Sequence, residues 1–405
     1  MRKIVLILAL ACWGCGEGSE STLPANSPSA NLTPALVSRI LQPPTGLVTS
    51  RFVTHDPGFN DYRPTFSPDD GTLVFERNAI GNHQVRLHKV SSSGGSVTFL
   101  LNGFGQNSTR PDWSVGSNRI AFTAENSSAG TLWVCNPDGS NLLEVAPGVF
   151  GKQVNYPHWF PDGQNLAVTD YGDGSLATSK GIVRKVRVSD KATSNLTDPG
   201  HLLAGDSAVS PDGRWLALAA QADVSRPYDQ NTNNIFVIDL KGGKNAVPLL
   251  FDGGQGRAPS WSPDGRVILF ESNRTSSSGQ YALFAKRFSG QASDLNGALL
   301  QLTPDALDGQ HGEFSHSGTQ VVLSALQSSS PGAQLTAKPL VMLTVHHLNN
   351  SRSHRILWLL EELELPYEIR SYQRHPETMR APDTLKQVHP LGKSPVVTDG
   401  ELVLA

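Results

Sequence analysis

The chain has 405 residues, a net charge of −3 and 17% charged residues. This nearly neutral balance excludes a chain that holds nucleic acid through a strongly basic surface, so we expect no nucleic-acid partner. The length allows two or three domains. With 38 Gly and 27 Pro, the composition is typical of many short strands joined by turns.

Residues 1–15 form a candidate export signal. Arg2 and Lys3 precede an apolar run that is too short to cross a bilayer as a helix of the mature protein. Cys12 and Cys15 follow this run. The stretch resembles a bacterial lipoprotein signal peptide, in which the cysteine after the cleavage site is lipidated. The resemblance implies a protein held at a membrane by a lipid anchor.

Cys15 fits the lipidated position better than Cys12, because Gly14 precedes it and the apolar run then has a normal length. In the family, an aspartate directly after the lipidated cysteine retains the protein at the inner membrane. Trp13 and Gly16 occupy these positions here, so the resemblance implies an outer-membrane location facing the periplasm. A plain secretory signal is the alternative.

Residues 16–47 are rich in Ser, Pro, Asn and Leu without sustained periodicity, which predicts a flexible tether. The third cysteine, Cys135, has no disulfide partner once one of the others is lipidated. It lies in a strand-like apolar stretch, and we predict that it is a buried small apolar residue.

From residue 48 to 340 one phrase recurs, consisting of an aromatic or apolar anchor, Ser-Pro-Asp-Gly or a near copy, and an alternating strand. The anchors are Phe66, Trp113, Trp159, Val209, Trp261 and Phe314, spaced 46 to 53 residues apart. Such a period indicates a repeat architecture. The phrase is also a turn, because Pro sets φ, Asp bonds its own backbone and Gly accepts a positive φ.

Residues 257–303 show one full repeat with four expected strands. These are Ala258–Ser262, Val267–Glu271, Tyr281–Phe288 and Leu299–Thr303. Four antiparallel strands per unit of this length are typical of a propeller blade, so six anchors predict six blades. The last repeat offers Val321–Ala325 as its second strand and Gln334–Leu340 as its third, but no fourth.

The N-terminal stretch Arg51–Thr54 is similar to a fourth strand, so we expect it to complete the sixth blade and close the ring. The fold class expected for residues 48–340 is therefore all-β, a six-bladed β-propeller closed by an N-terminal strand. The repeat resembles the WD40-like repeats of TolB-type periplasmic propellers. That resemblance specifies the fold and leaves the partner open.

Polar or aromatic residues stand three positions before five of the six anchors. They are Arg63, Arg110, Tyr156, Asp206 and His311. The corresponding position before the anchor Trp261 is Ala258. We expect a ring at the mouth of the channel, in which two cations suit an anionic group. The alternative is that they begin strands in a solvated funnel. The loops of varying length on the same rim predict a binding face for an envelope protein or a small ligand.

Catalytic signals in this region are weak. The sequence has no Gly-x-Ser-x-Gly elbow and no metal-ligand spacing, so we expect no metal and no cofactor. The repeated aspartates Asp69, Asp162, Asp212 and Asp264 are explained by the turn.

Residues 342–405 have a different pattern. A strand from Met342 leads to the helix-start signal Asn350-Ser-Arg-Ser, a helix over Arg355–Leu363, a second strand and a hairpin through Asp399-Gly400. This segment resembles the thioredoxin-like N-terminal domain of bacterial glutathione S-transferases. We expect a truncated α/β fragment joined to the propeller by a gene fusion or an assembly artefact.

The resemblance implies roles for several residues of this segment. Ser351 matches the group that stabilises the glutathione thiolate, whose pKa falls near a donor and a helix N-terminus. An N-cap is the alternative role for the same hydroxyl. The implied glutathione-binding residues are Ser353, Lys393, Ser394, Pro395 and Val396, with Pro395 at the family's cis-proline.

These patterns predict a cell-envelope lipoprotein whose propeller binds a partner, joined to an inactive transferase fragment. The first alternative is a genuine glutathione S-transferase, with glutathione as co-substrate, delivered by the propeller. The second is a propeller hydrolase or lactonase, which requires Arg63, Arg110 and His311 to converge on one pocket.

Overall fold

The computed structural model describes two compact units. One comprises residues 1–295 and 302–337, and the other comprises residues 296–301 and 338–405. The described residues are 3–9, 49–54, 56–125, 129–172, 181–225, 229–243, 245–250, 254–290, 299–326, 343–349, 351, 353, 355–357, 367–375, 378, 380–389, 394–399 and 402–404. The predicted tether and the candidate lipidation residues Cys12 and Cys15 lie outside them.

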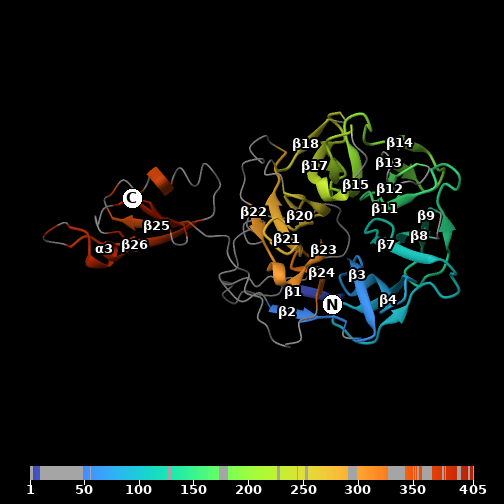
Figure 1. Ribbon diagram of the computed structural model, residues 1–405, viewed down its shortest axis with the longest axis horizontal. Helices are drawn as coiled ribbons and strands as arrows, with labels where there is room; N and C mark the ends of the chain where they lie inside the picture. Colours follow the sequence, from blue (N-terminus) through green and yellow to red (C-terminus); the bar gives the residue numbers. More distant parts are fainter. Residues whose placement is uncertain are drawn as a thin grey trace, which may run out of the picture. The chain divides into compact units, whose positions relative to one another are not determined.

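The first unit is built from six four-stranded antiparallel sheets, which follow one another around a ring in Figure 1. Blade one contains β3 (Phe59–Phe66), β4 (Thr72–Ala79), β5 (Arg86–Ser91) and β6 (Thr98–Phe99). Blade two contains β7 (Asn107–Trp113), β8 (Ile120–Glu125), β9 (Gly130–Cys135) and β10 (Leu143–Glu144). Blade three contains β11 (Val154–Trp159), β12 (Asn165–Asp170), β13 (Ile182–Arg187) and β14 (Thr193–Asn195).

The remaining blades repeat this order. Blade four contains β15 (Leu203–Val209), β16 (Trp215–Gln221), β17 (Asn234–Asp239) and β18 (Ala246–Pro248), with a 3-10 turn at Gln230–Thr232. Blade five contains β19 (Arg257–Trp261), β20 (Val267–Ser272), β21 (Ala282–Arg287) and β22 (Leu299–Gln301). Blade six contains β23 (Gln310–Phe314), β24 (Gln320–Leu326), β1 (Lys3–Ala9) and β2 (Thr49–Phe52), and a 3-10 turn at Asp305–Leu307 precedes it.

The first strand of each blade is the innermost one. Each inner strand contacts the inner strands of the two neighbouring blades, and β23 contacts β3, so the ring is closed. Buried apolar side chains pack between neighbouring sheets, as where Leu166 of blade three meets Ala121 and Leu132 of blade two. This arrangement confirms the predicted six-bladed, all-β propeller.

The repeated turn forms as its chemistry predicts. In the second full copy Gly163 has φ 62°, and Gly213 and Gly265 have φ 68° and 70°. The first copy carries an extra residue, so Asp70 takes the positive φ of 58° in place of Gly71. The Ser67 hydroxyl donates to Asp69 Oδ1 at 2.5 Å and accepts from the Thr72 amide at 2.8 Å, which locks the hairpin.

The sixth blade differs from the expectation at its third strand. The N-terminal strand β2 completes the blade as predicted, but it pairs with β1 rather than with Gln334–Leu340. Strand β1 in turn pairs with β24 along its whole length, from Lys3 with Leu326 to Ala9 with Gln320. The apolar run that indicated an export signal also suits the middle of a buried sheet, which explains how sequence patterns alone missed it. Residues 334–340 lie outside the described residues.

Cys135 is fully buried at the end of β9, as predicted. Burial raises the pKa of its thiol to about 12, so the side chain behaves as a small apolar group.

The second unit contains one mixed sheet and a short helix. Its strands are β25 (Leu343–Leu348), β26 (Tyr367–Tyr372), β27 (Val396–Asp399) and β28 (Leu402–Leu404), and its helix is α3 (Asp383–Val388). Strand β25 is parallel to β26 and antiparallel to β27, in the order β26-β25-β27-β28. Residues 355–357 are helical after β25, where the sequence predicts the first helix.

Candidate functional site

A bulge interrupts the inner strand of every blade. In blade one Tyr62 pairs with Glu76, but Thr65 pairs with Val74, so two residues of β3 face one residue of β4. The same shift recurs in β7, β11, β15, β19 and β23. Five of the six positions singled out three residues before the anchor adopt a left-handed φ of 45° to 55° here. They are Arg63, Arg110, Tyr156, Ala258 and His311.

Blade four departs from this pattern. Its register shifts between Ala204 and Ser207, one residue farther from the hairpin than in the other blades. Asp206 is therefore the second residue of its bulge, and it lacks the positive φ of the other five positions. Counting back from the anchor selects the right region in blade four but misses the equivalent residue, which is Gly205.

Three of the singled-out side chains meet directly. The guanidinium carbon of Arg110 lies 4.7 Å from the centre of the Tyr156 ring, and that of Arg63 lies 6.0 Å from it. Arg110 forms a close ion pair with Glu125 and donates to Asn155 Oδ1 at 3.2 Å. We call Arg63, Arg110, Tyr156 and Asp206 the mouth cluster.

Asp206 is half-buried and electrostatically coupled to both arginines. Loss of water contact raises the pKa of its carboxyl to about 6, although Arg63 and Arg110 lower it. Among the described residues, no hydrogen bond or ion pair reaches this carboxylate. Its charge therefore changes close to neutral pH, in the centre of a group of cations.

His311 lies in a second group. Its main-chain amide donates to Glu271 Oε2 at 2.7 Å, and Glu271 Oε1 accepts from Arg257 Nη2 at 2.7 Å. Arg257 also stacks on Tyr281, 4.1 Å from the ring centre. The two groups lie within electrostatic reach of each other, because Glu271 and Arg257 act on the Asp206 carboxyl together with the two arginines of the mouth cluster.

The acidic partners were missed from the sequence, although a signal was present. Glu76 and Glu271 stand in second strands that are otherwise mostly apolar, opposite the bulge of their own blade. Each accepts the bulge amide of the next blade, Glu76 from Arg110 at 2.6 Å and Glu271 from His311 at 2.7 Å. A buried acid in an apolar strand indicates such a cross-blade partner.

Polar side chains one residue before several anchors also link neighbouring blades. Glu313 accepts from the Phe66 amide and from the Thr65 hydroxyl, both at 3.1 Å. Asp112 accepts from the Trp159 amide at 2.6 Å. Loss of water contact, followed by the charge of Asp112, raises the pKa of Glu313 to about 8, so this group is mostly protonated at neutral pH.

In the second unit, a chain of hydroxyls surrounds the residue proposed to face glutathione. Ser351 Oγ lies 2.7 Å from Ser353 Oγ and 3.1 Å from Ser394 Oγ. Ser353 is fully buried and contacts His347 Nδ1 at 2.7 Å, so it supports Ser351 rather than facing a ligand. Its carbonyl accepts from the Leu357 amide, which places Ser353 at the helix start.

Ser394, Pro395 and Val396 lead into the inner strand β27. The Ser394–Pro395 peptide is cis, as the resemblance implies for this proline. Val396 begins β27 with a buried side chain and pairs with His346. Lys393 lies outside the described residues.

The described residues contain no group of three or more His, Cys, Asp or Glu side chains arranged to hold a metal ion. None of their helices has the length and apolar character needed to cross a membrane.

Comparisons with known proteins agree with this division. Residues 341–405 match the family "Glutathione S-transferase, N-terminal domain". A stretch of 58 residues is 55% identical to Glutathione S-transferase 3 of Schizosaccharomyces pombe, covering 14% of this chain and 23% of that protein. A stretch of 161 residues is 26% identical to the Tol-Pal system protein TolB of Bordetella pertussis, covering 40% of this chain and 33% of that protein. The chain thus spans a third or less of the length of these relatives.

A solved structure of TolB from Agrobacterium tumefaciens has the same fold as most of the chain. The TM-score is 0.56 at 14% identity, and the match covers 81% of this chain and 99% of that one. An identity this low shows the fold alone. The chain therefore joins a TolB-like β-propeller to a segment that matches the N-terminal domain of glutathione S-transferases.

Proposed function

We propose that the propeller is a binding module of the cell envelope, which takes an acidic group of a protein or small ligand at the mouth cluster. The observation that carries this proposal is the meeting of Arg63 and Arg110 at Tyr156. Guanidinium groups suit a carboxylate, because they can donate two parallel hydrogen bonds to it.

Binding is favoured over hydrolysis by how the residues are grouped. A hydrolase or lactonase acting at the mouth needs Arg63, Arg110 and His311 around one pocket. The contacts join the two arginines through Tyr156 but join His311 to Glu271. A scaffold that holds cations on rigid, bulged strands is suited to recognition.

The binding role is tested by a photo-reactive phenylalanine analogue placed at Tyr156 in living cells. We expect a discrete cross-linked product that Arg110→Gln abolishes. The analogue at Leu143, which is 42% exposed on the outer strand of blade two, is the matched control. A product from Leu143 but none from Tyr156 would place the binding face elsewhere and overturn the proposal.

The affinity for an acidic ligand should depend on pH. The pKa of Asp206 is raised to about 6, so lowering the pH through this value removes a negative charge beside the two arginines. We expect binding to tighten as pH falls from 7 to 5, and Asp206→Asn to bind with little change over that range. Isothermal titration of the cross-linked partner, once identified, measures this. Weaker binding at low pH would contradict it.

We further propose that the chain is lipid-anchored at Cys15, or at Cys12, and faces the periplasm from the outer membrane. The support is the basic and apolar N-terminus followed by cysteine. Mass spectrometry of the N-terminal peptide, with Cys15→Ser and Cys12→Ser as matched variants, identifies the lipidated residue. Cleavage before the lipidated cysteine would remove residues 3–9, and with them β1. An unmodified N-terminus that retains these residues would contradict the lipid anchor and leave β1 in blade six.

The C-terminal unit supplies the second candidate function. We propose that it is inactive and that the propeller carries the function. Glutathione transfer is the alternative, favoured by the position of the Ser351 hydroxyl 3.1 Å from Ser394 Oγ and by the family match over 341–405. Retention of the full chain on immobilised glutathione decides between them. Retention that Ser351→Ala abolishes supports the transferase, whereas loss of retention in both proteins supports the inactive unit.

A further inference from the structure

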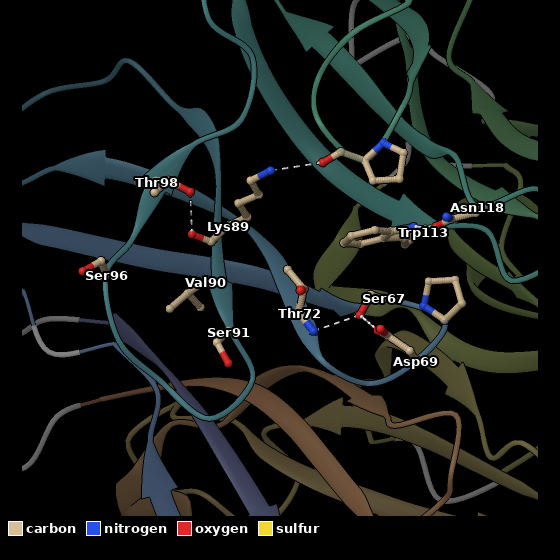
Figure 2. A pocket seen from close by; sticks show the side chains of 12 residues that line it. Ser67, Asp69, Thr72, Lys89, Val90, Ser91, Ser96, Thr98, Trp113 and Asn118 are labelled. Carbon is tan, nitrogen blue, oxygen red and sulfur yellow. Dashed lines mark hydrogen bonds between the residues drawn. The ribbon is translucent and has the colours of Figure 1, made fainter.

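A cavity of about 600 Å³ opens between blades one and two, away from the mouth cluster (Figure 2). Blade one lines it with Thr72, Lys89, Ser96 and Thr98, and blade two lines it with Trp113 and Pro137. We call this cavity the interblade groove. Its volume falls within the range of small-ligand pockets, roughly 300–1,000 Å³.

The space between blades four and five corresponds to the interblade groove, but side chains fill it. In the hairpin of blade one the amide of Thr72 donates to the Ser67 hydroxyl at 2.8 Å, and in that of blade four the amide of Trp215 donates to the Ser210 hydroxyl at 2.9 Å. Thr72 of blade one is therefore equivalent to Trp215 of blade four.

The strand pairings extend this equivalence to the outer strands. Lys89 pairs with Val74 and with Thr98 in blade one. Val237 pairs with Ala217 and with Val247 in blade four. Lys89 and Thr98 thus replace two valines of the equivalent sheet.

On the facing blade, Pro137 is equivalent to Phe288. The anchors Trp113 and Trp261 pair with Ile120 and Ile268 of the second strands. These pair in turn with Cys135 and Lys286, and Pro137 and Phe288 each lie two residues farther along the chain. Phe288 closes the space between blades four and five, with T-shaped contacts to Trp215 at 4.9 Å and to Trp261 at 5.2 Å. The interblade groove is open because Thr72 and Pro137 leave this space empty.

The polar groups in the groove are mixed in character. The Thr72 and Ser96 hydroxyls have no hydrogen-bond partner among the described residues, and each can both donate and accept. Lys89 Nζ donates a long hydrogen bond to the Pro137 carbonyl at 3.4 Å, drawn as a dashed line in Figure 2. The indole of Trp113 forms an apolar wall, and its N–H is held by Asn118 Oδ1 at 2.8 Å.

The charge of the groove favours a neutral ligand. Lys89 is its cation, and Asp69 lies in the same lining. Asp138 is also close enough to Lys89 for the ammonium to help lower the pKa of that carboxyl, after hydrogen bonds from Ser140. The lone ammonium is thus already balanced by carboxylates, which leaves little attraction for an anion.

We propose that the interblade groove binds a neutral oligosaccharide. Sugar hydroxyls both donate and accept hydrogen bonds, as do Thr72 and Ser96, and the apolar face of a sugar ring suits the Trp113 wall. The site is separate from the mouth cluster, so it adds a second ligand to the propeller rather than refining the first.

The test is titration of the full chain with maltotriose, chitotriose and trigalacturonate, followed by calorimetry and by saturation-transfer NMR. We expect one of the two neutral trisaccharides to bind. The variant Thr72→Trp with Pro137→Phe transfers the residues of blades four and five into the groove and should weaken binding at least tenfold. Lys89→Met, which removes the ammonium and keeps the stem, should weaken it severalfold.

Two controls separate this site from the rest of the molecule. Val115→Thr changes a 62% exposed side chain outside the groove lining and should leave sugar binding unchanged. Arg110→Gln should also leave it unchanged, so failure at the mouth cluster and failure at the groove are distinguishable. Circular dichroism and thermal melting check that each variant folds, and Lys89→Met decides the outcome if the filled variant does not.

Three results would overturn the proposal. These are that neither neutral trisaccharide binds, that trigalacturonate alone binds, or that the folded groove-filling variant binds a neutral trisaccharide as well as the natural chain does. Each of these places the polar residues of the groove in a purely structural role or gives the site to another ligand class.

Discussion

The two units of this chain were recognisable for opposite reasons. The propeller repeats its own sequence six times, so its fold follows from internal comparison while its ligand does not. The C-terminal unit occurs once, and it matches a family of known chemistry at 55% identity over 58 residues. Repetition therefore specifies architecture, and departures from the repeat, such as the mouth cluster and the interblade groove, indicate where function lies.

The strongest test of this comparison is a buried ion pair confined to blade one. Arg77 Nε donates to Asp61 Oδ1 at 2.6 Å, and both residues are at most 4% exposed. Asp61→Ala removes the buried partner of the guanidinium, leaves it only the half-exposed Asp56 at 3.5 Å, and should lower the free energy of unfolding by about 3–5 kcal/mol. Urea unfolding followed by tryptophan fluorescence measures the loss, because six of the seven tryptophans, all except Trp358, lie outside residues 342–405.

The two units should respond separately to this change. Binding of the full chain to an antibody against native residues 342–405 is the control, and we expect it to survive at urea concentrations that unfold the Asp61→Ala propeller. Simultaneous loss of both signals would show that the units unfold together and would break the comparison.

The next largest effect belongs to the C-terminal unit. Ser353 is fully buried, and its hydroxyl contacts His347 and Ser351, both at 2.7 Å. Ser353→Ala removes a buried hydroxyl that links two polar side chains and should cost about 1–3 kcal/mol of local stability. Hydrogen exchange of the β25 amides measures this. Equal effects on propeller amides would contradict the separation of the units.

Glu313 provides a pH test within the propeller. The pKa of its carboxyl is raised to about 8 in the folded chain, from an ordinary value of 4.5. The folded state therefore retains a proton that the unfolded state releases, so stability falls as pH rises from 4.5 to 8. The slope is on the order of 1 kcal/mol per pH unit.

Glu313→Gln should remove this contribution and flatten the pH profile measured by urea unfolding between pH 5 and 8. Glu125→Gln changes an acid that is 31% exposed and serves as the matched control, since its profile should follow that of the natural chain. A profile for Glu313→Gln that keeps the natural slope would assign the dependence to another group.

The smallest expected effect comes from an exposed ion pair. Lys386 Nζ lies 2.7 Å from Asp383 Oδ1 within one turn of α3, and both side chains are more than half exposed. Solvent screens such a pair, so Asp383→Ala should leave the urea midpoint of either unit unchanged. A measurable shift would mean that α3 depends on this pair, in contrast to the buried pair of blade one.

Local chemistry made most of the fold predictable. The hairpins and the anchors follow from residues close together in the chain, whereas the bulges three residues before five anchors were not predicted. The partners of the bulge residues were not predictable in the same way, because Glu76 and Glu271 bond to the next blade rather than to their own. Asp206 was displaced by one position because the bulge of blade four moves along its strand.

The sixth blade shows a different limit. The apolar run near the N-terminus satisfies the requirements of an export signal and of a buried strand equally well, so composition does not choose between them. The choice is made by an open position beside β24, which is formed by residues at the other end of the propeller. The pairing of β1 with β24 depends on the closed ring and cannot be inferred from a local stretch of sequence.

The pairing of β1 with β24 also sets the order of events during synthesis. Lys3 leaves the ribosome long before its partner Leu326, because most of the propeller lies between them in the chain. Blades one to five can each form from neighbouring residues as they emerge, whereas the sixth must wait for its distant half. The seam of the ring is consequently the last part to assemble, and until it closes the nascent chain exposes an unpaired β24 edge that chaperones can recognise.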